Sequence, residues 1–151
     1  MKQFILASLA LLTANAHANL DTRSDAAAQY AVNTYQDAQI HTLANLVSYP
    51  TVNKDGINTP DNLDFIGFKT LLKMKAAELG FDFQDLGYTV LIGMGQQTDK
   101  VTIVTHGDVQ PADASKWQNS PFEMDKTSEP GKLIARGTED DKALSRRLYM
   151  Q

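Results

Sequence analysis

The sequence predicts an α/β fold in which helices pack on one mixed sheet. Two long stretches in the first half carry apolar residues at intervals of three and four, which indicates amphipathic helices. Three short stretches rich in β-branched residues follow, which indicates strands. Helices followed by strands are typical of layered structures. A length of 151 residues is enough for one domain of this kind.

Composition and charge restrict the functions that the chain can have. A formal net charge of −4 gives no sign of the positively charged surface that nucleic-acid-binding proteins have, so no nucleic-acid partner is predicted. The chain has no cysteine, which excludes disulfides and thiolate metal sites. Any transition metal would therefore be held by histidine and carboxylates. The histidines are His17, His41 and His106.

The first eighteen residues predict a signal peptide. Met1 and Lys2 give a positive start, and residues 4–12 form an apolar run too short to span a bilayer. Ala16-His17-Ala18 fits the cleavage pattern of small residues. Cleavage after Ala18 would remove His17 and leave residues 19–151 as a periplasmic or secreted protein with no membrane attachment. A buried N-terminal helix is the alternative.

The first helix is predicted over residues 21–49. Pro50 ends it, because the residue before a proline is pushed out of the helical region. His41 lies within this helix and is interpreted as a surface or core residue rather than a ligand. A second helix is predicted over residues 62–79, with Gly80 at its C-terminal end. Its expected buried residues are Phe65, Phe68, Leu71, Leu72 and Met74.

Three strands are predicted over residues 81–84, 89–93 and 100–105. The third is rich in β-branched residues, which favours a buried central strand. Further along, residues 121–126 and 132–135 are expected to pair as a hairpin across a turn that contains Pro130 and Gly131.

The residues that can carry chemistry lie in two stretches. His106 follows the third predicted strand, at the carboxyl end where α/β proteins bind ligands. Asp108 is on the same side of an extended chain, so it can orient the His106 ring as residues behind a metal-bound histidine do. Residues 139–141 are three consecutive acids, which repel one another unless they are solvated or neutralised by a metal or by Lys142. The alternative is a solvated helix N-terminus capped by Thr138.

Together the two stretches resemble the dinuclear zinc metallopeptidase family of carnosinase-like dipeptidases, aminoacylases and succinyl-diaminopimelate desuccinylases. Residues 46–52 are similar to the end of that family's opening helix. The resemblance implies that residues 19–151 are the N-terminal portion of a zinc-peptidase catalytic domain, without the lid or dimerisation domain. The matching residues are His106-Gly107-Asp108-Val109-Gln110-Pro111, Trp117, Pro121-Phe122, Gly131-Lys132-Leu133 and Arg136-Gly137-Thr138-Glu139-Asp140-Asp141-Lys142.

The resemblance implies a role for three residues. His106 is implied as a ligand of one zinc, Asp140 as the carboxylate that bridges two zinc ions, and Asp108 as the catalytic-site residue that orients His106. Cobalt or manganese could also occupy a site of histidine and carboxylates. The implied reaction is hydrolysis of a dipeptide or small amide, with N-acyl-amino-acid hydrolysis as the alternative. Relatives are often homodimers.

The sequence also departs from the family pattern. Family members supply a general-base glutamate and further metal ligands after the bridging aspartate, and these are expected to be missing here. Ala143 replaces a glycine, and Arg146-Arg147 is foreign to a helix expected to be buried. We therefore expect a truncated and inactive chain with weak metal binding and an exposed sheet edge. A frameshift, a premature stop and a fragment are alternative origins. An acidic module that binds cations or basic peptides is a further alternative.

Overall fold

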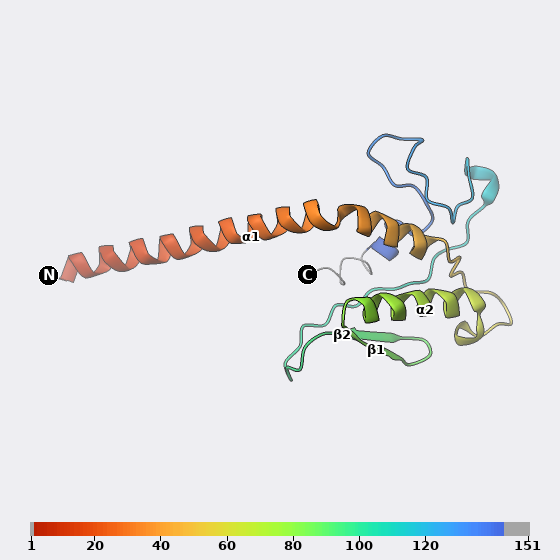
Figure 1. The fold of residues 1–151 in the computed structure, drawn as a ribbon, viewed down its shortest axis with the longest axis horizontal. Helices are drawn as coiled ribbons and strands as arrows, with labels where there is room; N and C mark the ends of the chain where they lie inside the picture. Colours follow the sequence, from red (N-terminus) through yellow and green to blue (C-terminus); the bar gives the residue numbers. More distant parts are fainter. Residues whose placement is uncertain (1, 144–151) are drawn as a thin grey trace. The chain divides into compact units, whose positions relative to one another are not determined.

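The computed structural model describes residues 2–143, with side chains from residue 22 onwards. The chain divides into two compact units, Met1–Ala38 and Gln39–Gln151, which are described separately. Figure 1 shows the elements in chain order. No helix in the described part of the chain is both long and apolar enough to span a membrane.

The first helix, α1, comprises Lys2–Val47 and supplies all of the described first unit. The prediction that this helix begins at residue 21 is wrong. The chain contains no glycine or proline before Pro50, so nothing in the sequence interrupts the helix after Lys2. Its end at Val47, shortly before Pro50, agrees with the prediction. The helix does not test the predicted cleavage after Ala18, which stays a prediction.

The second helix, α2, comprises Leu63–Glu78 and follows a short 3-10 helix, η1 (Thr59–Asp61). The Asn62 side chain accepts a hydrogen bond from the backbone N–H of Asp64 and so caps the helix. Gly80 follows the last turn with φ +72°, which confirms its predicted place at the helix end.

The buried face of α2 was predicted only in part. Phe68 and Leu72 are buried as expected, and Ala76 continues the same line of residues spaced by four. Met74 is 56% exposed, so its predicted burial is wrong. It lies two positions from both Leu72 and Ala76, and residues two apart do not share a helix face.

Two strands form an antiparallel sheet beside α2 (Figure 1). Strand β1 is Asp82–Asp85 and strand β2 is Val90–Gly93, in a register that pairs Asp82 with Gly93 and Asp85 with Val90. The predicted bounds differ from these by one residue. Helices and a small sheet form part of an α/β domain, as predicted, but the described sheet is antiparallel rather than mixed.

The third predicted strand, residues 100–105, is not a strand in the described structure. The segment is extended, yet Val101 is 95% exposed and Val104 is 86% exposed. A strand requires hydrogen bonds to a neighbour, and no described segment forms a ladder with these residues. A β-branched sequence favours a strand only where it can pack, so the predicted central strand is wrong for this structure.

The predicted hairpin after residue 120 is reduced to one bridge. Asp125 and Ile134 exchange two backbone hydrogen bonds of 2.9 Å. Lys132 N–H donates to Glu129 C=O, and Gly131 at φ +78° closes the turn. The pairing across the predicted turn is therefore confirmed only at its centre.

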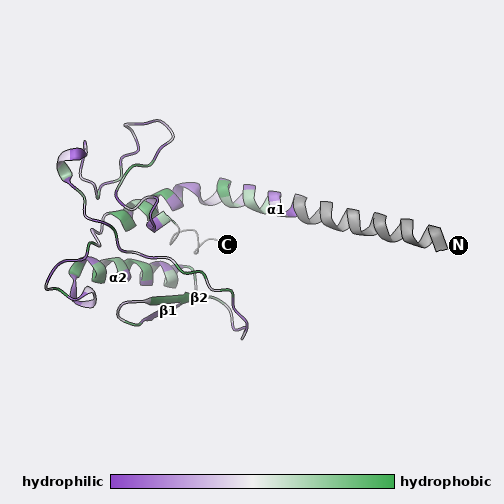
Figure 2. Cartoon of the chain, turned by 180° about the vertical axis from the view of Figure 1, so that it is seen from behind, coloured by the Kyte–Doolittle hydropathy of each residue, from purple (hydrophilic) through white to green (hydrophobic). Residues whose placement is uncertain are grey.

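The second unit has two hydrophobic clusters, and each includes residues from the last turns of α1. Leu43 and Val47 pack with Ala135, whereas Leu46 packs with Phe68 and Leu72. Figure 2 shows hydrophobic colour on these helix turns and on the sheet. The C-terminal end of α1 is therefore the shared support of the unit. The partly buried residues around the two clusters are Met124, Leu133 and Ala143 in the first and Tyr49, Leu71, Phe83, Val90 and Ile92 in the second.

Candidate metal centre

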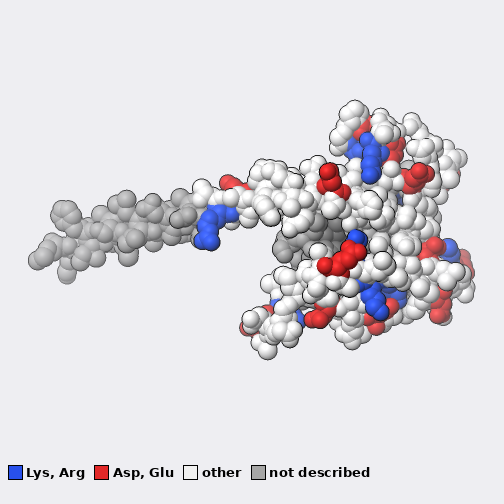
Figure 3. Space-filling model, in the orientation of Figure 1, with Lys and Arg blue, Asp and Glu red and all other residues white. Residues whose placement is uncertain are grey.

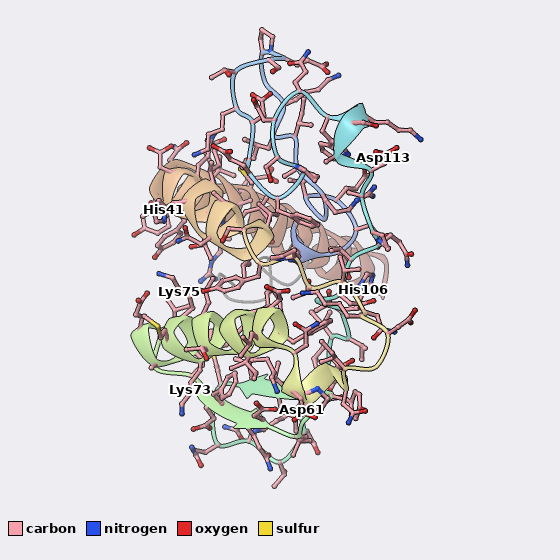
Figure 4. All side chains as sticks on the ribbon, turned by 90° about the vertical axis from the view of Figure 1, so that its right-hand side faces the viewer. His41, Asp61, Lys73, Lys75, His106 and Asp113 are labelled. Atoms are coloured by element: carbon pink, nitrogen blue, oxygen red, sulfur yellow. The ribbon has the colours of Figure 1, made fainter. Side chains whose placement is uncertain are left out.

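The two stretches singled out in the sequence meet in space. The Nε2 atom of His106 is 2.9 Å from Oδ1 of Asp140, although the residues are 34 positions apart. The side chains are 49% and 83% exposed, so both are accessible from solvent. Figure 4 labels His106 among the side chains of this region. The structure thus places one imidazole nitrogen beside one carboxylate at the surface of the second unit.

Asp108 lies on the other side of the His106 ring. The ring Nδ1 is 3.1 Å from the backbone carbonyl oxygen of Asp108 and 3.2 Å from its Oδ1. With Nδ1–H donating to Asp108, the contact at Nε2 is a hydrogen bond only when Nε2 also carries a proton and donates to Asp140. Asp108 therefore lies beside Nδ1 through its backbone carbonyl and its carboxylate, and its role in orienting a metal-bound His106 stays a prediction.

The surroundings of His106 change its affinity for protons. Burial alone would lower the pKa of the ring, but the hydrogen bonds to the Asp108 carbonyl and the Asp140 carboxylate, together with the charges of both carboxylates, raise the pKa above its usual range. The ring lies between two acceptors, so its doubly protonated form satisfies both.

The segment that follows α1 holds the histidine loop. Thr51 is fully buried, and its hydroxyl donates a 2.6 Å hydrogen bond to the carbonyl of Gly107. The N–H of Val109 donates to the carbonyl of Thr51 at 2.9 Å. A Cβ atom at Gly107 would lie 2.5 Å from the Phe68 ring, so a larger residue there would force the ring or the loop to move.

A tight turn presents Asp140. The N–H of Lys142 donates to the carbonyl of Gly137 at 3.1 Å, and Gly137 has φ +88°. A Cβ atom at Gly137 would lie 2.7 Å from Val109, so the two loops touch at this glycine. The hydroxyl of Thr138 donates to the carbonyl of Ala135, not to a helix N–H. The proposed helix cap at Thr138 is therefore wrong for the described residues.

The other members of the acidic run differ in their surroundings. Glu139 is exposed, and Asp141 accepts a hydrogen bond from the hydroxyl of Thr105. The peptide bond between Asp140 and Asp141 is cis. On the face shown in Figure 3, acidic and basic side chains are interspersed.

Lys142 has a place that the sequence did not indicate. Its side chain is fully buried, and Nζ donates to the backbone carbonyls of Leu46 at 3.0 Å and of Tyr49 at 2.6 Å. Burial lowers the pKa of Lys142 to about 8, while the charges of Asp108 and Asp64 oppose that shift. Its hydrogen bonds thus go to the end of α1 rather than to the acidic run. In the sequence, a lysine next to acidic residues suggests an ion pair. The fold instead places its ammonium against backbone carbonyls at the end of α1.

The remaining residues singled out in the sequence make other contacts. His41 is exposed, and its Nδ1 is 3.3 Å from Nδ2 of Asn45 in the next turn of α1. Trp117 lies under the guanidinium of Arg136, with 5.7 Å between the guanidinium carbon and the ring centroid. The side chain of His17 is outside the described residues.

The pair His106 and Asp140 fits one half of a zinc site. Zinc bonds of about 2.0–2.2 Å at a tetrahedral angle set a histidine nitrogen and a carboxylate oxygen about 3.4 Å apart. The observed 2.9 Å requires only a small opening of the side chains. The Asp108 carboxylate lies on the Nδ1 side of the ring and adds no third ligand. Within the described part of the chain, no group of three or more metal-binding side chains gathers.

Comparison with known proteins gives two kinds of similarity. No protein-family model matches the chain. In sequence, it is 32% identical over 92 residues to aminoacylase-1 of Mus musculus and to aminoacylase-1A of Rattus norvegicus. These matches cover 56% of this chain and 22% of each relative, so the chain spans about a fifth of the relatives' length.

In structure, the chain is similar to human carnosine dipeptidase 1. The crystal structure of that protein matches with a TM-score of 0.61 and 22% sequence identity. The match covers 80% of this chain and 28% of the dipeptidase chain. This similarity shows the fold, which is that of a part of the dipeptidase.

Proposed function

We propose that this chain is part of a protein of the aminoacylase and carnosinase-like dipeptidase family, to which its sequence and fold are similar, and that its function is metal-dependent hydrolysis of an amide bond. The substrate class is a dipeptide, as the resemblance to the dipeptidases suggests. An N-acyl-amino acid is the second candidate, because the sequence matches are to aminoacylases. The observation that carries the proposal is the 2.9 Å approach of His106 Nε2 to Asp140 Oδ1.

Each residue of the site has a separate task in this proposal. Zinc, when bound, supplies a Lewis acid that polarises the scissile carbonyl and lowers the pKa of a bound water. His106 offers Nε2 and Asp140 offers a carboxylate oxygen. Asp108 holds the proton on Nδ1, which keeps the Nε2 lone pair free. Gly107 and Gly137 let the loops approach Phe68 and Val109 closely enough to bring these groups together.

The residues assigned to the site supply only some of the groups that such a hydrolysis requires. His106 and Asp140 are two protein ligands, whereas a closed zinc site has about four. None of the residues assigned to the site is placed to act as a general base. We propose that the chain alone binds one metal ion weakly and does not turn over substrate.

The test is Co²⁺ binding to the full chain, followed by visible absorption, in wild type, His106→Ala and Asp140→Asn. We expect weak binding that each substitution abolishes. His41→Ala is the control, because His41 is exposed and outside the site. Binding that is the same in His106→Ala would contradict the half-site and favour an acidic cation-binding module. Turnover of a dipeptide or an N-acetyl-amino acid above the His106→Ala background would contradict the expected inactivity.

We also propose export, because residues 1–18 have the pattern of a signal peptide. The exported product should then begin at Asn19. N-terminal sequencing that finds Met1 on a product retained in the cytoplasm would contradict this.

A further inference from the structure

We propose that Lys142 is a positioning residue that fixes Asp140 against His106 by tying the turn of Asp140 to the C-terminal end of α1. The inference rests on the proposed function, since that function assigns Asp140 to the metal. It adds a residue that contacts neither metal nor substrate in the proposal.

The contacts of Lys142 show what its ammonium does. The C-terminal carbonyls of a helix accept hydrogen bonds from donors beyond it, and those of Leu46 and Tyr49 each accept one backbone N–H, from Tyr49 at 3.4 Å and from Thr51 at 2.9 Å. Leu46 lies in the final turn of α1 and Tyr49 just beyond it, and Lys142 Nζ donates to the carbonyl of each. A cation is also favoured at this end of the helix dipole. Nζ lies 5.1 Å from the centroid of the Phe68 ring, so an aromatic face covers the same ammonium.

A short path connects this anchor to Asp140. Lys142 is two residues further along the chain, and its N–H closes the turn by donating to Gly137. The side-chain stem of Lys142 also packs on this glycine, because a Cβ atom built there would lie 3.4 Å from Lys142 Cδ and 3.6 Å from Cγ. A displaced Lys142 side chain would therefore move both ends of the turn that presents Asp140.

The other half of the site is fixed to the same support by different bonds. Thr51 follows the end of α1 and holds the His106 loop through Gly107 and Val109. Phe68 lies against Gly107 and under the Lys142 ammonium. Both loops are thus held against the end of α1, but the hydrogen bonds of Lys142 hold the Asp140 loop, whereas those of Thr51 hold the His106 loop. Loss of Lys142 should displace Asp140 and leave His106 in place.

The test compares Lys142→Met with Leu72→Ala in the full 151-residue chain. Methionine keeps an unbranched apolar stem and removes the donors. Leu72 is buried against Leu46 and Phe68, so its truncation lowers stability without touching the Lys142 hydrogen bonds. Two properties are measured: the nuclear Overhauser contact between the His106 ring and the Asp140 β protons without metal, and Co²⁺ affinity.

We expect Lys142→Met to lose the ring contact and to lower Co²⁺ affinity by about tenfold or more, as substitutions behind a metal ligand do. Leu72→Ala should keep the ring contact and the Co²⁺ affinity, even where it lowers the urea midpoint as much as Lys142→Met does. Lys142→Arg, which keeps a cation with several donors, should recover part of each. Should Lys142→Met fail to fold, Lys142→Gln replaces it under the same criteria, because its shorter side chain cannot reach both carbonyls.

A Lys142→Met chain that keeps the contact and binds Co²⁺ like wild type would overturn the inference. Equal losses in Lys142→Met and Leu72→Ala would do the same, because they would show general destabilisation. Wild type that shows the ring contact but binds no Co²⁺ would instead refute the proposed function. In that case the inference about Lys142 would stand if Lys142→Met loses the ring contact and would fail if Lys142→Met keeps it.

Discussion

At the scale of single residues, glycine at position 107 sets how closely the histidine loop approaches α2. Any Cβ atom there would lie 2.5 Å from the Phe68 ring, a distance at which one of the two must move. The loop is held from the other side by Thr51, so it cannot retreat without breaking the hydrogen bond to Gly107. The position of His106 therefore depends on a residue that carries no chemistry.

Gly107→Ala is expected to destabilise the fold by about 1–3 kcal/mol, because overpacking forces side chains or backbone to shift. Gly93→Ala is the matched control, since a Cβ atom at Gly93 meets nothing within 4 Å and its φ is not in the left-handed region. Urea denaturation of both variants measures the difference. Equal stability of the two would contradict the close packing at Gly107.

The site residues differ in how far the sequence could predict them. His106, Asp108 and Asp140 stand in short motifs, and the structure places all three together. Their roles at a metal stay predictions. The anchor at Lys142 could not be predicted, because its partners lie 96 and 93 positions away and are backbone carbonyls without any side-chain signature.

At the scale of elements, local signals fixed the helix ends. Pro50, Asn62 and Gly80 each act on their immediate neighbours, so the end of α1 and both ends of α2 could be predicted. The segment 100–105 could not be predicted in this way, because strand formation depends on a partner far along the chain. Its β-branched residues are compatible with a strand but do not supply the neighbour.

Asp125 stabilises the turn after the single bridge and gives it a pH dependence. Its carboxylate accepts hydrogen bonds from the Ser128 hydroxyl and from the N–H groups of Thr127 and Ser128, which hold its pKa well below the usual value of 3.8. A carboxyl whose pKa is lowered on folding stabilises the fold above its unfolded pKa. That contribution is lost as pH falls below 3.8 and through the folded pKa.

The amide resonances of Thr127 and Ser128 should therefore stay unchanged from neutral pH down to about 4 and shift only in stronger acid. Asp125→Asn should remove this acid transition. Amide shifts recorded against pH in both chains measure it. A transition centred at the ordinary carboxyl pKa would show that the hydrogen bonds do not hold in solution.

At the scale of the whole molecule, the extended segment is the feature with the greatest consequence for solution behaviour. Val101, Ile103 and Val104 are 95%, 49% and 86% exposed on a segment with the propensity of a strand. Unpaired extended chain with apolar side chains is a template for pairing between molecules. We expect the chain to self-associate through residues 101–104 as its concentration rises.

Val101→Lys with Val104→Glu should reduce this association, because charges on an edge oppose pairing. Light scattering against concentration measures it. The control is Tyr88→Lys with Met94→Glu, which changes two residues of similar exposure, 73% and 63%, outside the segment. If only the control pair of substitutions reduces the association, the contact between molecules lies outside the segment of Val101 and Val104.

His106 and Asp140 are proposed to hold one metal ion together. X-ray absorption at the zinc edge of the full chain with one equivalent of zinc tests it most directly. We expect one imidazole nitrogen and one carboxylate oxygen at about 2.0–2.2 Å from the zinc, with water completing the shell. Imidazole scattering should vanish in His106→Ala and persist in His41→Ala. A shell of oxygen alone in the wild type, or an imidazole signal that depends on His41, would contradict the claim.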